Sequence, residues 1–264
     1  MTAPPLLAEP ELEAHVRALR ERGFTVVERS HAPDTVARFR AGLQRLYEDH
    51  GAPKPYSANG EQLGPDVQLA PTGFVVTRLL ALFPEFADEL VSASVVEIVR
   101  RLLGRDMHLE LTGAVLCDAA RPFFSWHNHI GGIDVEDYRA RTTWPRFVES
   151  QRVIVVLYLD DIDAEGGELR AYPRAIRDPT EAPHDQMQPD WDGQVALTFP
   201  AGSTVIFEQC TWHAAISRTR PGLRMFVGAY MTSARAPKTD AVDDSLRDFA
   251  GGGALLQSLL LRNR

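Results

Sequence analysis

The chain has 264 residues, of which 44% are hydrophobic and 24% are charged, a composition typical of a globular protein with a substantial core. The formal net charge of −8 at pH 7 argues against a nucleic-acid partner, which would require a basic surface. No stretch approaches the roughly 18 apolar residues of a membrane span and the first residues lack the pattern of a secretion signal, so we expect a cytoplasmic protein with no membrane partner.

The first part of the chain has the periodicity of helices. Residues 11–22 and 33–49 each place apolar side chains on one stripe, which predicts two amphipathic helices, and residues 24–27 predict a short strand between them. Residues 51–73 are rich in Gly, Pro, Asn and Ser and predict a loop. Residues 83–103 predict a third helical region, and it is left open whether this is one helix or two helices with a break near residues 92–94.

From residue 107 onward the pattern changes to short runs rich in Val, Ile, Leu, Phe and Tyr, separated by turn residues. The predicted strands are 108–117, 123–129, 151–159, 169–172, 194–199, 203–207, 211–216 and 223–231. Short strands after a helical half predict a mainly β fold with a double-stranded β-helix core, the cupin-like jelly roll, and flanking helices.

We find no repeat and no domain boundary, and therefore expect a single domain over 1–264. The expected parts are a mostly helical segment (1–105), the jelly-roll core (106–232) with insertions at 130–150 and 176–193 that are candidates for a substrate lid, and a C-terminal tail (233–264). The apolar end of the tail, Ala254 to Leu261, predicts a helix that packs on this domain or on a second copy in a homodimer.

The two cysteines lie in apolar, strand-like segments. Cys117 and Cys210 are therefore expected to be buried free thiols and not a disulfide.

Two histidines with one residue between them are the first sign of a metal site. His127 and His129 lie in a predicted strand, where side chains alternate, so both imidazoles point to the same face and can hold one metal ion. A third histidine, His213, comes from a distant strand and could complete a three-ligand face. Such a face leaves coordination positions open, which suits a catalytic metal. The other histidines, His15, His31, His50, His108 and His184, have no such pattern and are expected to be structural.

Four segments together resemble the phytanoyl-CoA dioxygenase family of Fe(II) and 2-oxoglutarate-dependent oxygenases, and the resemblance covers nearly the whole chain. Residues 11–45 resemble the opening helix, Gly-Phe-x-Val-Val strand and second helix of that family. Trp126-His127-Asn128-His129 lies where the family has Trp-His-x-Asp. Residues 166–173 are similar to its Asn-Gly-x-Leu-x-x-x-Pro turn and strand, with Gly166 in place of Asn, and His213 to Arg224 has its spacing from the distal histidine to an arginine.

The resemblance implies a cofactor set and roles for particular residues. It implies Fe(II) held by His127 and His213, and 2-oxoglutarate whose far carboxylate is bound by Arg224, since a guanidinium is a two-pronged donor that stays charged when buried. Arg218 and Arg220 fall in the turn before Arg224 and are expected to face solvent or substrate.

The third ligand departs from the family pattern, because His129 replaces the aspartate. This exchange raises the net charge of the metal centre by one unit. Three arrangements are open: His129 ligates, it swings aside and leaves a position for water, halide or substrate, or a nearby carboxylate such as Asp134 substitutes. We favour ligation by His127, His129 and His213, because imidazole is a good iron ligand and the spacing already aims the ring.

The expected function is a non-haem iron, 2-oxoglutarate-dependent dioxygenase that acts on a small organic or natural-product molecule by hydroxylation or a related C–H oxidation. Two alternatives are a three-histidine metal dioxygenase that does not use 2-oxoglutarate and a catalytically silent binding protein of the same fold. The aromatic residues beside the ligands are core residues or pocket walls, namely Phe123, Phe124, Trp126 and Trp212. Gly166 and Gly167 are expected to be turn residues with no chemical role. Contact with substrate is open for a further set, but a solvated position is expected for each: Arg121, Asp134, Trp144 and Arg170.

Overall fold

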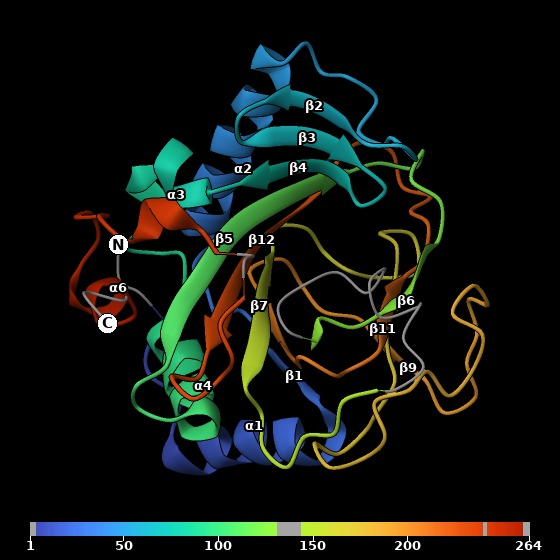
Figure 1. Cartoon of the computed structure of the whole chain (residues 1–264). Coiled ribbons are helices and arrows are strands. Elements are labelled where there is room, and N and C mark those ends of the chain that lie inside the picture. Colours follow the sequence, from blue (N-terminus) through green and yellow to red (C-terminus); the bar gives the residue numbers. More distant parts are fainter. Residues whose placement is uncertain (1–3, 131–143, 240–241, 261–264) are drawn as a thin grey trace.

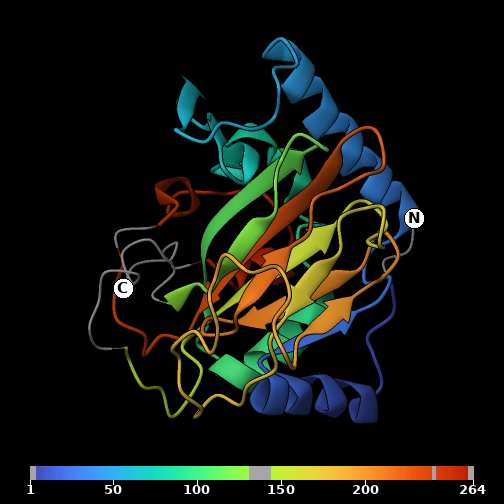
Figure 2. The same cartoon turned by 90° about the vertical axis from the view of Figure 1, so that its right-hand side faces the viewer.

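The computed structural model describes residues 4–130, 144–239 and 242–260, and in this part of the chain two antiparallel β-sheets face each other (Figures 1 and 2). The larger sheet has eight strands, in the order β1 (Phe24–Val27), β10 (Thr204–Glu208), β7 (Arg152–Tyr158), β12 (Arg224–Thr232), β5 (His108–Cys117), β4 (Gly73–Thr77), β3 (Val67–Ala70) and β2 (Glu61–Gly64). The smaller sheet has the order β6 (Phe124–His127), β11 (His213–Ala215), β8 (Leu169–Ala171) and β9 (Val195–Leu197). This arrangement confirms the predicted jelly-roll core with flanking helices.

The helices cover the outer face of the larger sheet. In Figure 1, α3, α4 and α6 lie on the opposite side of this sheet from β6, β9 and β11. The helical elements are α1 (Glu9–Arg22), α2 (Pro33–Asp49), α3 (Leu79–Leu82), η1 (Pro84–Phe86), α4 (Ala93–Leu103), η3 (Asp244–Leu246) and α6 (Ala254–Gln257).

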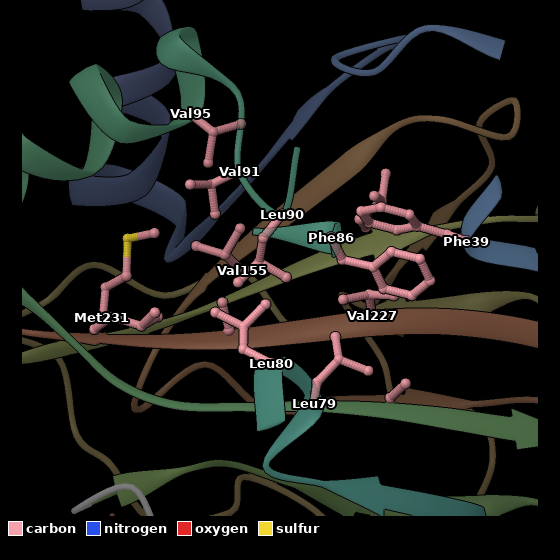
Figure 3. Packing of buried hydrophobic residues seen from close by; sticks show 14 of the residues in the cluster. Phe39, Leu79, Leu80, Phe86, Leu90, Val91, Val95, Val155, Val227 and Met231 are labelled. Atoms are coloured by element: carbon pink, nitrogen blue, oxygen red, sulfur yellow. The ribbon is translucent and has the colours of Figure 1, made fainter. Parts of the chain in front are cut away.

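Alternation along the strands gives the larger sheet two different faces. On β12, Val227 and Met231 point to the helices and join a core cluster with residues such as Phe39 and Leu80 (Figure 3). Their neighbours Gly228 and Tyr230 point to the smaller sheet. The helix-facing side therefore builds the main core, and the other side packs into a second apolar cluster with the smaller sheet and lines the cavity between the sheets.

Close packing at the end of α1 ties this helix to the strand that carries His213. Gly23 ends α1 with a left-handed φ of 79°, and its N–H donates to the carbonyl of Leu19. A Cβ at this position would lie 2.2 Å from Oγ1 of Thr211, whose hydroxyl donates to the carbonyl of Gly23. Only glycine fits both the backbone angle and this approach.

The prediction of a loop over 51–73 is wrong, because this region forms β2 and β3 and begins β4. These strands extend the larger sheet from β5, with β4 paired to β5 and β3 paired to β4. Val67 and Leu69 alternate as buried residues along β3, but short, polar strands at a sheet edge have a weak local pattern. They form because a neighbouring strand offers them backbone partners.

The third helical region is also shorter than predicted. A regular helix begins only at Ala93, where Oγ of Ser92 accepts a hydrogen bond from the N–H of Val95. Before it, α3 and η1 are single turns separated by Phe83.

The apolar tail packs on this chain's own core. Helix α6 covers only Ala254–Gln257, and Leu256, Leu259 and Leu260 are buried in the same cluster as the helix-facing strand residues. The N–H of Leu109 on β5 donates to the carbonyl of Leu259 at 2.7 Å.

The organisation of residues 1–264 as a single domain stays a prediction.

Candidate active site

Three imidazoles converge on the inner side of the smaller sheet. His127 ends β6 and His213 begins β11, and these residues are direct partners in the antiparallel pairing of the two strands. His129 lies two residues beyond β6, and its N–H donates to the carbonyl of Gln209 at 2.8 Å. The potential ligand atoms of the three histidines all lie within 4.8 Å of one another. Among the described residues, no other group of His, Cys, Asp or Glu is arranged in this way.

Hydrogen bonds at Nδ1 orient each ring. Nδ1 of His127 lies 2.9 Å from the carbonyl oxygen of Ser125, and Nδ1 of His213 lies 2.9 Å from that of Thr211. A carbonyl only accepts, so in both rings Nδ1 carries the proton and Nε2 presents a lone pair. Nδ1 of His129 lies 2.9 Å from the hydroxyl of Tyr230 on β12.

Burial keeps His129 and His213 neutral. It lowers the pKa of His129 and of His213 well below the usual value, and the neighbouring imidazole lowers each pKa further. The ring of Phe207 stacks on His213 at 4.4 Å between centroids, and Phe124 meets His127 edge-on at 4.6 Å. The neutral rings are in the protonation state that a metal ion requires.

The histidines lie at the wall of a cavity of about 350 Å³ between the two sheets. Its walls are mostly apolar and come from alternate residues of the long strands, which include Val115, Ile154, Val156, Phe226 and Gly228. Thr72, Thr77 and Arg78 also line it. Asp243 is the one carboxylate among the described lining residues, and it accepts hydrogen bonds from Thr112 and Ser245.

Arg224 lies in this cavity with the histidines, as its spacing from His213 predicts. Its side chain is 1% exposed, and its Nη1 donates to the carbonyl of Gly167 at 2.6 Å. Its Nε is buried and has no hydrogen-bond partner among the described residues. A buried guanidinium without a carboxylate partner is the feature expected of an anion-binding site.

Gly167 is more than a turn residue. Its φ of +86° is left-handed, and a Cβ there would lie 2.8 Å from the carbonyl oxygen of Ile216 and 3.0 Å from Nη1 of Arg224. The glycine therefore allows its own carbonyl to approach and orient Arg224. The Gly166-Gly167 pair predicts the turn, whereas the contact with Arg224 comes from the fold.

Two arginines differ from expectation. Arg121 is 3% exposed and lines the cavity, so the expectation of a solvated position is wrong. Arg218 is also buried and donates to the carbonyls of Arg220 and Pro221, so it stabilises the turn and does not face solvent. Arg220 is half-exposed and pairs with Asp163. Polar side chains close to a turn are read from sequence as exposed, because local pattern does not reveal burial by a distant sheet.

The aromatic residues beside the ligands divide between two faces of the smaller sheet. Phe124 lines the cavity, whereas Trp126 and Trp212 are buried in a separate cluster on the opposite face. Trp191 stacks on Trp126 with 4.2 Å between centroids, so the insertion at 176–193 packs on that opposite face. Its role as a lid stays a prediction, and most of the insertion at 130–150, with Asp134, lies outside the described residues.

Two further candidates have local partners. Arg170 donates to Glu168 and to Asp190, and Trp144 packs against Trp212. The sequence does not point to Tyr230, because only the fold brings its hydroxyl to His129.

No described helix combines the length and the apolar character needed to cross a membrane.

Comparisons with solved structures support the fold. The carbocyclase SnoK, described as a non-heme alpha-ketoglutarate-dependent enzyme from nogalamycin biosynthesis, is 22% identical with a TM-score of 0.64, covering 100% of this chain and 98% of SnoK. AviO1 from Streptomyces viridochromogenes is 18% identical with a TM-score of 0.60, over 88% of this chain and 100% of AviO1. HygX from Streptomyces hygroscopicus, solved with nickel and 2-oxoglutarate, is 14% identical with a TM-score of 0.59, over 94% of this chain and 96% of HygX.

Sequence comparison identifies the family. No curated protein matches the chain. The family profile of phytanoyl-CoA dioxygenase (PhyH), however, matches residues 19–226, a span that contains the three histidines and Arg224. The predicted enzyme class, an Fe(II)- and 2-oxoglutarate-dependent dioxygenase, is the class of that family. The chain therefore belongs to the phytanoyl-CoA dioxygenase family.

Proposed function

We propose that the protein is a non-haem iron, 2-oxoglutarate-dependent oxygenase that oxidises a C–H bond of a small organic or natural-product substrate, with His127, His129 and His213 as the three protein ligands of iron. The observation that carries this proposal is the convergence of three buried imidazoles that come from distant parts of the chain. The outcome of the oxidation is hydroxylation or a related reaction of the same C–H bond.

The distances within the histidine cluster fit one cation. The Nε2 atoms of His129 and His213 are 3.2 Å apart. Two nitrogen ligands, each about 2.1 Å from one metal ion and at a right angle, are about 3.0 Å apart. Since Nδ1 of His127 and His213 is held by a carbonyl, the Nε2 lone pairs are the ones left for the metal.

The absence of a carboxylate among these ligands distinguishes the site from the usual pattern of two histidines and one carboxylate. Three neutral imidazoles leave the full charge of the cation uncompensated by its protein ligands. Anionic groups of the cosubstrate or substrate are therefore attracted more strongly than in a site that contains an aspartate.

The remaining residues have positioning and shielding roles. Iron and 2-oxoglutarate, when bound, would supply with dioxygen the oxidising power for C–H cleavage, with succinate and carbon dioxide as the coproducts. Arg224 would hold the far carboxylate of 2-oxoglutarate, and the carbonyl of Gly167 fixes the guanidinium. Apolar walls such as Val156, Leu169 and Phe226 exclude water from the reacting groups.

The cavity and the comparisons support a small-molecule substrate. A cavity of about 350 Å³ holds 2-oxoglutarate and leaves room for part of a further molecule. The apolar walls favour a hydrocarbon or ring system, and Thr72, Thr77 and Arg78 offer polar contacts. SnoK, which has a similar fold over the full length of the chain, is an enzyme of nogalamycin biosynthesis, and this supports a natural-product substrate.

The test is metal analysis combined with 2-oxoglutarate turnover. Protein purified without oxygen and loaded with Fe(II) should bind stoichiometric iron and release succinate from 2-oxoglutarate in the presence of dioxygen, even without substrate. His213→Ala should lose both properties, whereas His184→Ala, which alters a histidine outside the cluster, should keep them. Iron binding without succinate formation would instead favour a three-histidine dioxygenase that does not use 2-oxoglutarate. A protein that binds no metal would be a binding protein of this fold.

A further inference from the structure

We propose that Arg121 and Arg224 together form a clamp of two guanidinium groups for a single carboxylate, the far carboxylate of 2-oxoglutarate. This inference rests on the proposed function and adds a second cosubstrate-binding residue that neither motif nor spacing indicates. The pair is called the arginine clamp below.

Arg121 is buried, and no residue in the described part of the chain compensates its charge. It is 3% exposed and lines the cavity, and its side chain has no hydrogen bond or ion pair with any described residue. Its Nη2 is fully buried, and none of the described residues offers it a hydrogen-bond partner. The guanidinium lies over the ring of Phe124, 5.6 Å from the ring centroid, which orients it but does not neutralise it. A buried charge left in this state is costly unless a ligand of opposite charge binds.

Two other buried arginines, Arg152 and Arg174, have their charge compensated by carboxylates inside the fold. Arg152 donates to both carboxylate oxygens of Glu110, and Arg174 pairs with Glu208. Arg121 and Arg224 differ from these two residues because neither has a carboxylate partner among the described residues and both face the cavity. The contrast indicates that the missing anion comes from outside the chain.

The two guanidinium groups lie at the same end of the cavity. Arg224 is paired with Cys117 across β12 and β5, and Arg121 follows Cys117 by four residues through a turn in which the N–H of Arg121 donates to the carbonyl of Asp118. Both arginines also lie close to Tyr158 and Cys117. Burial, and then the positive charge of Arg224, lower the pKa of Arg121 to about 10, so both groups remain charged at pH 7 and repel each other. An anion between them would remove this repulsion.

The position of Phe124 indicates which carboxylate the clamp holds. Its ring contacts the guanidinium of Arg121 on one side and lies 4.6 Å from the ring of His127, between centroids. Arg121 and His127 therefore both lie against the same aromatic ring. We infer that one end of a short dicarboxylate lies at the histidines while the other lies in the arginine clamp.

The experiment measures dicarboxylate binding and not turnover. We would titrate 2-oxoglutarate and glutarate into metal-free protein and into protein loaded with redox-inactive nickel, by calorimetry. Arg121→Met should weaken the binding of both ligands by about 10- to 100-fold, which is the effect of losing one charge-assisted hydrogen bond. Arg121→Lys should restore part of the affinity, since it keeps the charge but not the planar fork. Arg224→Met should weaken binding as well, and the double variant should show non-additive loss because both groups share one carboxylate.

Thermal melting separates this role from a structural one. Without ligand, Arg121→Met should melt at the same temperature as the wild type or higher, because the substitution removes an unpaired buried charge, whereas a structural arginine would cause a lower melting temperature. Arg170→Met is the matched control, since Arg170 is paired with Glu168 and Asp190 outside the cavity, and it should leave dicarboxylate affinity unchanged. If Arg121→Met does not fold, Arg121→Lys is compared with the wild type in its place.

Two negative results have different meanings. Dicarboxylate affinity that stays within twofold of the wild type in Arg121→Met, or in Arg121→Lys where only that variant folds, overturns the arginine clamp while leaving the proposed function intact. A wild-type protein that binds neither dicarboxylate, with or without metal, overturns the proposed function and the clamp together.

Discussion

The Nε2 atoms of His129 and His213 lie 3.2 Å apart although 84 positions separate the two residues in the chain. The pairing of β6 with β11 produces this proximity, because it places His127 opposite His213 and carries His129 just beyond the end of the strand. The candidate metal site thus depends on strand register as much as on residue type.

Replacement of His129 tests whether its imidazole is a ligand. His129→Ala should reduce iron affinity by more than the 10- to 100-fold that is typical of losing only a partner of a ligand. His129→Asp should retain more iron than His129→Ala, because a carboxylate also binds iron, but its shorter side chain and negative charge should lower native product formation per iron. Metal content and product formation measured on the same samples check both expectations. Wild-type iron affinity in His129→Ala would show that His129 does not ligate.

Tyr230→Phe tests the hydroxyl that contacts His129. The variant loses the oxygen 2.9 Å from Nδ1 of His129, and we expect metal affinity to fall by about 10- to 100-fold. The free energy of unfolding of the metal-free protein should change by only about 1 kcal/mol. Tyr47→Phe is the control, since its hydroxyl donates to the carbonyl of Pro53 away from the site, and it should leave metal affinity unchanged. Equal metal affinity in Tyr230→Phe and the wild type would contradict the expected role.

Gly228 and Gly113 are partners across β12 and β5 but should respond differently to alanine. A Cβ at Gly228 meets no atom within 4 Å, whereas one at Gly113 would lie 2.8 Å from the carbonyl oxygen of Val76. We expect Gly228→Ala to raise the free energy of unfolding by about 0.5–1 kcal/mol and Gly113→Ala to lower it. Chemical denaturation of both variants measures the difference.

A larger residue at Gly228 should affect the substrate and not the metal. Because Gly228 lines the cavity, Gly228→Leu should reduce the room for substrate while iron binding and substrate-independent succinate release persist. Loss of succinate release as well would mean that this part of the cavity holds the cosubstrate.

The pH dependence of stability should include a contribution from His31. Burial lowers the pKa of His31 to about 4, against about 6.5 in the unfolded chain. Below pH 6.5 the unfolded state therefore binds a proton that the folded state does not, and stability falls as the pH falls towards 4. Between pH 7.5 and pH 5 this residue should lower the free energy of unfolding by about 2 kcal/mol. In His31→Gln this part of the decrease in unfolding free energy should be absent. Denaturation of both proteins at the two pH values measures it, and an equal decrease in both would show that His31 does not contribute.

The strands of the core were predictable because their local pattern and their environment agree. Alternating apolar residues on β5 and β12 serve the helix-facing core on one side, and such residues are visible in a short window of sequence. Strands β2 and β3 lack this agreement. Their residues are polar or half-buried, and they become strands through pairing that begins at β5.

The sequence by itself determined the enzyme family, the two-sheet core and the candidate residues His127, His129, His213 and Arg224, because these depend on residue type, spacing and period. The tertiary structure alone decided which polar groups share one buried cavity. Arg121, Tyr230 and Gly167 acquired their positions from contacts between segments far apart in the chain. Burial of a charge and the approach of a hydroxyl to a ring nitrogen are properties of packed sheets, and no local pattern contains them.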